Sequence, residues 1–569
     1  MIRIKCWIER KLHRASHLNY AGAIFLALSV MLCPSGSFAA ASEPSQSLLV
    51  NLNSISDWST QHPFLNVIKS ARPWIGHKNG QWGGMTFHEL QAMGAIGDNG
   101  WPVFVPPGLR KVEALLFTDQ PDTAGYLGGR YHLYYDGVGD IRITGLGDTV
   151  LAKEGFIAFD YHPGEGAVGI AISSTDRDDP VRNIQVVHEK HAELLANGSV
   201  FSPEWLRIIR DFGGFRVMDW MNTNDSTLAT TDDLASPSDF SYSWRGVPIE
   251  VIVELANKTG ADPWFTIPHK ADDDVVREIA TRVKDGLDPH LTVYVEYSNE
   301  MWNYIFEQAH WAKDRAEAFW GPVPDGWMEF YGLRAAQVMD IWGDVFSENP
   351  DRLRRVVAVH TAWPELEKAT LYGPLAKRAL GKAPALSFDA YAVSGYFGHE
   401  LGDISVLRRI LDESEHAAMQ EGAKNGISDT ALREFVGQRG FERASERAAE
   451  IVRQGSLSSL ITKLWPYHAK AARDAGLDLV MYEGGSHAAA RDRAVNENRL
   501  TEFLTRFNYS DDMGELYDHA LSSWREVSDT PFNVFVDVAP PSKWGNWGAL
   551  RHLEDDNPRW QALRRALGE

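Results

Sequence analysis

Short runs of β-branched and aromatic residues alternate with segments of helical periodicity along most of this chain. The apolar runs predict strands at residues 64–74, 215–220, 263–269, 293–297, 356–360, 388–396, 479–482 and 532–536. Each of these strands except the first is followed by a helical pattern, directly or after a short loop. Eight strands alternating with helices favour an α/β fold, a closed (β/α)8 TIM barrel, over a doubly wound open sheet.

A different rhythm fills residues 98–190, where short strand patterns are separated by Gly-Gly, Asp-Gly and Pro-Gly turns. Regular short strands of this kind predict a β-sandwich-like domain. This domain either precedes the barrel or is inserted after its first strand, and we favour the insertion. Residues 41–97 then form a linker and the first barrel strand, and the barrel continues over 191–569. A helical insertion after strand six, at 400–475, is expected to cap one side of the cleft.

The first 40 residues have the features of a signal peptide. Basic residues precede an apolar run at 21–33, and Ser-Phe-Ala at 37–39 places small residues where a signal peptidase cleaves. The run is short for a membrane span, so we expect cleavage rather than an uncleaved anchor, and a secreted or periplasmic protein without membrane contact. A lipoprotein is disfavoured because Leu32, which is not a small residue, precedes Cys33.

Cysteine content and charge narrow the chemistry of the remaining chain. Both cysteines, Cys6 and Cys33, lie in the leader, so residues 41–569 hold no disulfide and no thiol nucleophile. The formal net charge is −21, and removal of a leader with five basic residues and one acidic residue leaves about −25. Such a charge repels nucleic acid and favours a neutral or weakly charged ligand. The 20 tryptophans suit stacking on sugar rings, although many of them can simply belong to the core.

Two of the predicted strands deliver a glutamate where they end. Ser-Asn-Glu follows the strand at 293–297 and ends in Glu300, and Glu483 directly follows the strand at 479–482. Parallel barrel strands bring their carboxyl ends to one rim, so both carboxylates are expected to face one substrate. Cleavage of a glycosidic bond needs a proton for the departing oxygen and negative charge beside the anomeric carbon. Two carboxylates in unlike environments supply both, so the sequence predicts a glycoside hydrolase.

Asn299-Glu300 at the end of strand four and Glu483 at the end of strand seven resemble clan A of the retaining glycoside hydrolases. The resemblance covers the barrel and implies cleavage of a β-linked poly- or oligosaccharide by double displacement, with Glu300 as acid/base and Glu483 as nucleophile. It implies that Asn299 binds the sugar 2-hydroxyl. The other substrate-binding residues that it implies are Arg216 and Tyr396, which hold the nucleophile ionised, His269 as a ligand of sugar hydroxyls, and Trp544 or Trp547 as a stacking platform.

Several of these residues also have purely structural interpretations. Glu296 shares the strand of Glu300 but lies deeper, where it is expected to pair with Arg216 or Lys69 rather than meet substrate. Arg216 can equally be no more than a core ion-pair partner. His269 and His360 can be structural hydrogen-bonding groups instead of ligands.

Other enzyme classes lack their motifs in this sequence. It contains no Gly-x-Ser-x-Gly elbow, no His-x-His, no His-Glu-x-x-His, no Walker-type loop, and no Gly-x-Gly-x-x-Gly that opens a helix. We therefore expect neither a metal nor a cofactor. The remaining alternative is a noncatalytic carbohydrate-binding protein on the same barrel, and the identity of the sugar and its linkage stay open.

Overall fold

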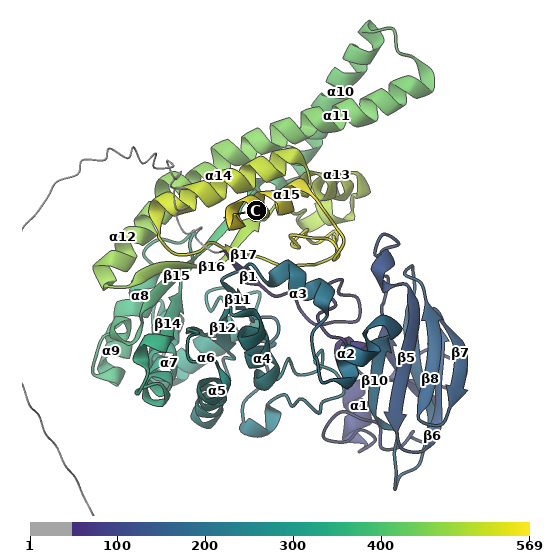
Figure 1. Ribbon diagram of the computed structural model, residues 1–569. Helices are drawn as coiled ribbons and strands as arrows, with labels where there is room; N and C mark the ends of the chain where they lie inside the picture. The colour runs from purple at the N-terminus through teal and green to yellow at the C-terminus, as the bar shows by residue number, and fades with distance from the viewer. Residues whose placement is uncertain (1–47, 569) are drawn as a thin grey trace, which may run out of the picture. The chain divides into compact units, whose positions relative to one another are not determined.

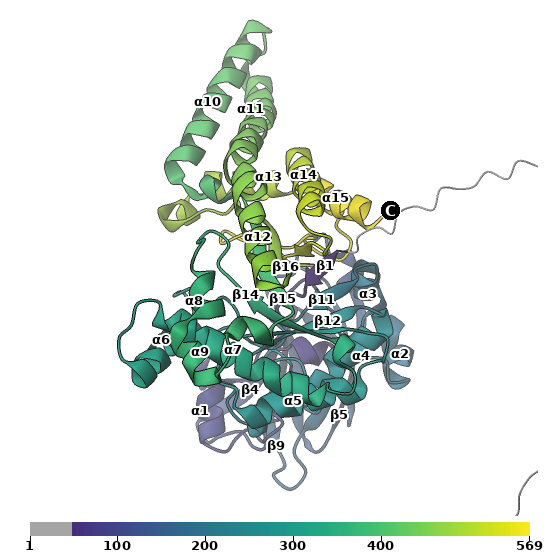
Figure 2. The same cartoon turned by 90° about the vertical axis from the view of Figure 1, so that its left-hand side faces the viewer.

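The computed structural model describes residues 48–568, so the predicted signal peptide at 1–40 lies outside the described residues. Eight parallel strands close into a barrel in the order β1-β11-β12-β13-β14-β15-β16-β17 (Figure 1 and Figure 2). These strands are β1 (Leu49–Asn51), β11 (Gly214–Arg216), β12 (Asp262–Ile267), β13 (Val293–Tyr297), β14 (Leu353–Ala358), β15 (Ala390–Phe397), β16 (Asp478–Ser486) and β17 (Asn533–Val534). The (β/α)8 TIM barrel expected from the sequence is confirmed.

Helices follow the barrel strands, with their apolar faces packed on the barrel. They are α3 (Pro203–Ile209), α4 (Ile249–Thr259), α5 (Asp273–Gly286), α6 (Glu307–Trp320), α7 (Gly326–Val345), α8 (Glu367–Tyr372), α9 (Pro374–Leu380), α12 (Trp465–Ala475), α13 (Asn498–Asn508), α14 (Asp511–Val527) and α15 (Pro558–Leu567). The helical segment after β14 is divided into α8 and α9 at Gly373, because Pro374 has no amide hydrogen with which to continue α8.

The prediction of the first barrel strand at 64–74 is wrong. The barrel strand is β1, a three-residue strand that ends at Asn51, inside the segment expected to be mainly linker. Residues 64–74 instead form an isolated bridge at Phe64 and a 3-10 turn at Val67–Ser70. Phe64 belongs to the barrel core and Trp74 to the sandwich core, so the segment is apolar because it is buried between two cores.

The predicted sandwich consists of two antiparallel sheets, with strand orders β3-β2-β4-β9-β6 and β10-β5-β8-β7. Its strands are β2 (Ile75–Lys78), β3 (Gly84–Met85), β4 (Leu109–Leu116), β5 (Gly129–Asp136), β6 (Gly139–Gly145), β7 (Gly147–Lys153), β8 (Phe156–Tyr161), β9 (Val168–Thr175) and β10 (Arg182–His188), with the short helices α1 (Phe87–Ala92) and α2 (Ala192–Ala196). The domain is inserted between β1 and β11, as expected. Its lower boundary at residue 98 is wrong, since β2 and β3 pair with β4 in the same sheet.

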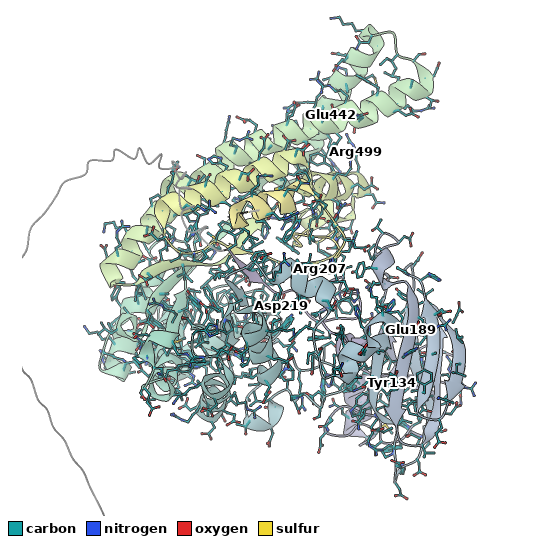
Figure 3. The ribbon with its side chains drawn as sticks, in the orientation of Figure 1. Tyr134, Glu189, Arg207, Asp219, Glu442 and Arg499 are labelled. Atoms are coloured by element: carbon teal, nitrogen blue, oxygen red, sulfur yellow. The ribbon has the colours of Figure 1, made fainter. Side chains whose placement is uncertain are left out.

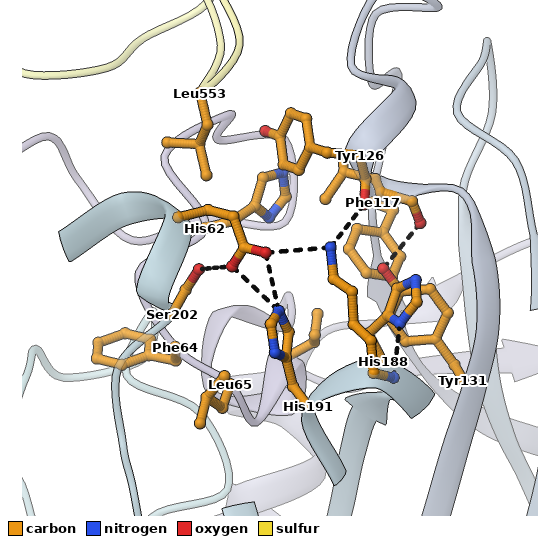
Figure 4. A pocket seen from close by; sticks show the side chains of 14 residues that line it. His62, Phe64, Leu65, Phe117, Tyr126, Tyr131, His188, His191, Ser202 and Leu553 are labelled. Atoms are coloured by element: carbon orange, nitrogen blue, oxygen red, sulfur yellow. Dashed lines mark hydrogen bonds and ion pairs between the residues drawn. The ribbon is translucent and has the colours of Figure 1, made fainter. Parts of the chain in front are cut away.

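A polar cluster joins the end of the sandwich to the start of the barrel (Figure 4). Glu204, in the first turn of α3, accepts hydrogen bonds from Ser202 at 3.0 Å and pairs with Lys190 at 3.1 Å and His191 at 3.0 Å. Burial alone raises the pKa of Glu204, but its own backbone N–H, Lys190 and His191 together lower that pKa to about 2. The carboxylate thus stays charged at neutral pH and keeps its partners from both domains in place.

The helical insertion forms an antiparallel pair, α10 (Ile404–Lys424) and α11 (Asp429–Val452), which run side by side away from the barrel (Figure 1 and Figure 2). Two π-helical turns, Arg453–Leu457 and Leu460–Leu464, connect α11 to α12. Within residues 48–568, none of the helices combines the length and apolar character needed to cross a membrane.

Candidate functional site

A pocket of about 620 Å³ opens at the carboxyl ends of the barrel strands. Glu300 and Glu483 both line it, although their strands, β13 and β16, are separated in the barrel by β14 and β15. Glu300 lies three residues beyond the end of β13. Glu483 lies within β16, which continues to Ser486, so the expectation that this strand ends before Glu483 is wrong. Closure of the barrel therefore brings together two carboxylates that lie far apart in the sequence.

Arg216, at the end of β11, is fully buried beneath the pocket and joins the two strand ends. Its Nη1 donates to Glu483 Oε1 at 2.6 Å and to Asn51 Oδ1 at 3.2 Å. Its Nε donates to Glu296 Oε2 at 3.0 Å, and its Nη2 donates to Asn299 Oδ1 at 3.0 Å. The expected pairing of Glu296 with Arg216 is therefore present. The planar guanidinium also holds the side chains of Glu483 and Asn299 in position through its hydrogen bonds.

Glu483 is 4% exposed and accepts hydrogen bonds from two directions. The Tyr396 hydroxyl donates to Oε2 at 2.7 Å, while Arg216 donates to Oε1. Burial is the main cause that raises the pKa of Glu483, and the Glu300 carboxylate raises it further. Arg216 and Tyr396 lower this pKa in part, and the resulting value is about 8. Arg216 and Tyr396 thus favour the charged form of Glu483, but they do not outweigh its burial and the neighbouring carboxylates.

Glu300 occupies a strained turn at the end of β13. Ser298 and Glu300 have φ angles of 63° and 41°, in the left-handed region that side-chain-bearing residues seldom adopt. Two donors fix the carboxylate there. The Tyr482 hydroxyl donates to Oε1 at 3.1 Å, and Asn303 Nδ2 donates to Oε2 at 2.8 Å. Tyr482 directly precedes Glu483, so β16 carries one of the two carboxylates and contacts the other.

Asn299, which precedes Glu300, has both ends of its side-chain amide engaged. Its Oδ1 accepts from Arg216, and its Nδ2 donates to Asn224 Oδ1 at 3.0 Å. Asn224 also accepts from Gln308 Nε2 at 2.7 Å. Asn299 lines the pocket and is 3% exposed, so the contact with a sugar 2-hydroxyl stays a prediction.

The two candidate tryptophans have different positions. Trp547 lines the pocket, and its ring packs against those of Tyr396, His487 and Phe535 with centroid distances of 6.4, 4.9 and 6.0 Å. Trp544 is 65% exposed, contacts Lys543, and does not line the pocket. Of the two, Trp547 is therefore the residue that can meet a ligand beside Glu483.

His269 is not among the residues that line the pocket, in contrast to the prediction that it binds substrate. It is 1% exposed and packs against Trp311 at a centroid distance of 5.4 Å. Burial lowers its pKa to about 4, with Lys270 lowering it further and Asp225 opposing, so the ring is neutral over the physiological range. His360, by contrast, does line the pocket.

Sequence reasoning missed Asp219, which follows β11 by three residues and lies among the barrel elements in Figure 3. Its carboxylate accepts no hydrogen bond from any described residue, and burial raises its pKa to about 6, opposed by Arg216 and assisted by Asp537. Asp219 and Asn224 line this pocket and also a neighbouring cavity of about 590 Å³ that reaches Phe87 of the sandwich. The Asp-Trp sequence after the strand was the available signal.

The expectation that the helical insertion caps the cleft is wrong. None of the residues that line the pocket comes from α10, α11 or the π-helical turns that follow them. In the part of the chain that the structure describes, no group of three or more His, Cys, Asp or Glu side chains is arranged to hold a metal ion.

Comparisons with known proteins add little to this geometry. No protein-family model matches the chain, and no curated protein matches it. Among solved structures it is similar to β-glucuronidase 2 of Bacteroides uniformis covalently bound to cyclophellitol-6-carboxylate aziridine, with 8% identity and a TM-score of 0.31 over 79% of this chain and 47% of that one. A calcium-binding mutant of the same enzyme gives 8% identity and a TM-score of 0.28, covering 79% and 46%. The chain thus spans about half the length of these structures, and similarities this weak say nothing about what it binds.

Proposed function

We propose that this protein is a glycoside hydrolase that cleaves β-linked poly- or oligosaccharide with retention of anomeric configuration. The observation that carries the proposal is the convergence of Glu300 and Glu483 on one pocket, with Glu483 held by Arg216 and Tyr396. Two carboxylates with different partners are the minimal apparatus for protonating a leaving oxygen while offering charge to the anomeric carbon.

In the proposed first step, a Glu483 oxygen attacks the anomeric carbon as the bond to the leaving oxygen breaks. Glu300 gives its proton to that oxygen, and a glycosyl ester forms on Glu483. In the second step, Glu300 takes a proton from water, the water oxygen attacks the anomeric carbon, and the ester bond to Glu483 breaks. Burial raises the pKa of Glu483 to about 8, so attack requires that Glu483 first lose its proton. The Arg216 guanidinium, which contacts Glu483 and not Glu300, opposes that rise and favours the charged form before attack and after release.

The surroundings of the pair fit a sugar as ligand. Trp547 and Tyr396 present aromatic surface beside Glu483, and Asp219 and Asn224 present oxygen and amide groups that can bind sugar hydroxyls. The protein is proposed to be secreted or periplasmic, on the strength of the leader sequence, and to act on saccharide rather than on nucleic acid, because of its negative charge.

The test measures hydrolysis of β-glucan, xylan, mannan and galactan by the purified protein. The release of reducing ends reports the rate of hydrolysis. The proposal is supported if the wild type hydrolyses one of these chains and if Glu300→Gln and Glu483→Gln each lower the rate by several orders of magnitude. The circular dichroism spectrum of both variants should stay unchanged. Unchanged turnover in Glu483→Gln contradicts it. Binding of chains without hydrolysis by the wild type supports the alternative, a noncatalytic carbohydrate-binding protein.

A further inference from the structure

Resting on the proposed function, we infer that aromatic residues beyond Glu300 bind the leaving part of the substrate, so that the enzyme acts on neutral chains that extend past the cleaved bond. The residues are Trp302, Tyr304, Trp327, His360 and Trp363, called here the aromatic row. They come from the segments that follow β13 and β14 and from the start of α7.

The members of the aromatic row contact one another in sequence, starting at the pocket floor. Trp302 packs against Tyr482, which contacts Glu300, with ring centroids 6.2 Å apart. The centroid of His360 lies 5.9 Å from that of Trp302 and 6.3 Å from that of Trp363. The row then continues from Trp363 to Trp327 at 6.4 Å and from Trp327 to Tyr304 at 5.9 Å. Aromatic side chains thus lead outward from the catalytic pair.

Exposure is lowest at Trp302, beside Tyr482, and highest at Trp363 and Tyr304, with the half-buried Trp327 between these two. Trp302 is 6% exposed, whereas Tyr304 is 42% and Trp363 49% exposed, and both of the latter line the pocket. Tyr304 is followed by Ile305, which is 84% exposed. Contiguous exposed apolar surface beside a pocket marks a binding site more often than a core, because a core of such residues would be covered.

The position of the row assigns it to the leaving side. Trp302 and Tyr304 lie two and four residues after Glu300 in the chain, and the acid must lie next to the oxygen that departs. The wall on the Glu483 side is instead closed by the mutual packing of Tyr396, Phe535 and Trp547. The portion of the chain beyond the departing oxygen therefore extends over Trp363 and Tyr304.

The charge of the pocket selects against acidic chains. Of the described residues that line it, none is Lys or Arg, while Asp219, Glu300 and Glu483 are carboxylates. Arg216 lies underneath and is fully buried, and its three nitrogens already donate to Glu296, Glu483, Asn51 and Asn299. A uronate at the site would face carboxylates without a free cation, so the inferred substrate is a chain of neutral sugars.

The test compares substrates of different length in Trp363→Ala. We expect kcat/KM on neutral cello-, xylo- or manno-oligosaccharides of four to six units, whichever the wild type cleaves, to fall by about tenfold or more. Turnover of the matching 4-nitrophenyl monoglycoside or diglycoside, whose leaving group does not reach Trp363, should stay within about twofold. Trp363→Phe should recover most of the loss on long substrates, because a ring remains. Trp82→Ala is the matched control, since Trp82 is 66% exposed and lies in the sandwich.

Binding in the Glu300→Gln background separates this inference from the proposed function. In one outcome, the wild type fails to cleave the saccharide while Glu300→Gln still binds it, with an affinity that the added Trp363→Ala substitution lowers. That result contradicts the proposed hydrolysis but supports the aromatic row as a binding site. Equal losses on long and short substrates, no loss on either, or unchanged chain affinity in Trp363→Ala overturn the assignment of the row. A preference of the wild type for oligouronates over neutral oligosaccharides overturns the assignment of a neutral chain.

Discussion

Replacement of Glu483 by Gln should make the protein more stable relative to the wild type as the pH rises. The cluster around Glu483 contains one guanidinium, Arg216, and three carboxylates, the buried Glu296 and Glu483 and the partly exposed Glu300. Three negative charges against one positive charge leave an excess that burial penalises. Glutamine keeps the shape and the acceptor oxygen of Glu483 without its charge, and Arg216 retains its ion pair with Glu296 at 2.9 Å.

The magnitude follows from the pKa of Glu483, which burial raises from 4.5 to about 8 against the opposing charge of Arg216. Because the folded-state pKa is higher, the folded protein binds the proton more tightly than the unfolded chain does. The stability that this proton confers is complete below pH 4.5, decreases as the pH rises from 4.5 towards 8, and is fully lost above pH 8. The wild type should therefore lose roughly 3–4 kcal/mol relative to Glu483→Gln between pH 5 and pH 8, at about 1.4 kcal/mol per pH unit.

Thermal unfolding by circular dichroism, at several pH values between 5 and 8, measures this difference. With an unfolding entropy that scales with about 520 residues, 1 kcal/mol corresponds to roughly 1 °C, so the Tm of Glu483→Gln should gain about 3 °C on the wild type across this range. Asp389→Asn is the control. Burial raises the pKa of Asp389, but its hydrogen bonds to Arg355 lower that pKa overall. The Tm difference between Asp389→Asn and the wild type should therefore be constant between pH 5 and pH 8. A pH-independent Tm difference for Glu483→Gln would refute the raised pKa.

Three further substitutions test individual contacts. Tyr396→Phe removes a 2.7 Å hydrogen bond that lowers the pKa of Glu483, so kcat/KM should fall by about 10- to 100-fold. The acidic limb of the pH profile of kcat/KM should move to higher pH, and an acidic limb at the same pH as in the wild type would contradict the contact. Trp547→Ala should reduce kcat/KM at least tenfold whereas Trp544→Ala should leave it within about twofold, and equal effects would refute the placement of the platform. Asp219→Asn should raise KM severalfold while increasing Tm above pH 6, because burial raises the pKa of Asp219 to about 6; a lower Tm would show a structural role instead.

The sequence predicts those parts of the fold that rest on long or repeated patterns. Strands β13 and β16 were found because their buried faces demand continuous runs of apolar and aromatic residues. Strand β1 was missed because three residues are too few for periodicity to register. The segment at 64–74 was wrongly predicted to be a strand, because burial between two domains gives the same apolar composition as a buried strand.

The site was predictable as far as barrel topology determines it. Glu300, Glu483, Arg216 and Tyr396 meet because each lies in, or just beyond, the carboxyl-terminal part of a parallel strand, and closure brings those parts to one rim. His269 also follows a strand, yet its ring packs against Trp311 away from the pocket, because strand position does not fix the direction of a side chain in the following loop. The aromatic row lies mainly in irregular segments, whose conformations depend on contacts that no local pattern encodes.

The most direct test of the central claim is the anomeric configuration of the first product, followed by proton NMR while the wild-type protein hydrolyses the most reactive chain of the panel. Double displacement through Glu483 predicts that the β-anomer appears first and mutarotates afterwards. An initial α-anomer would mean that water attacks the sugar directly, and Glu483 would then not be the nucleophile.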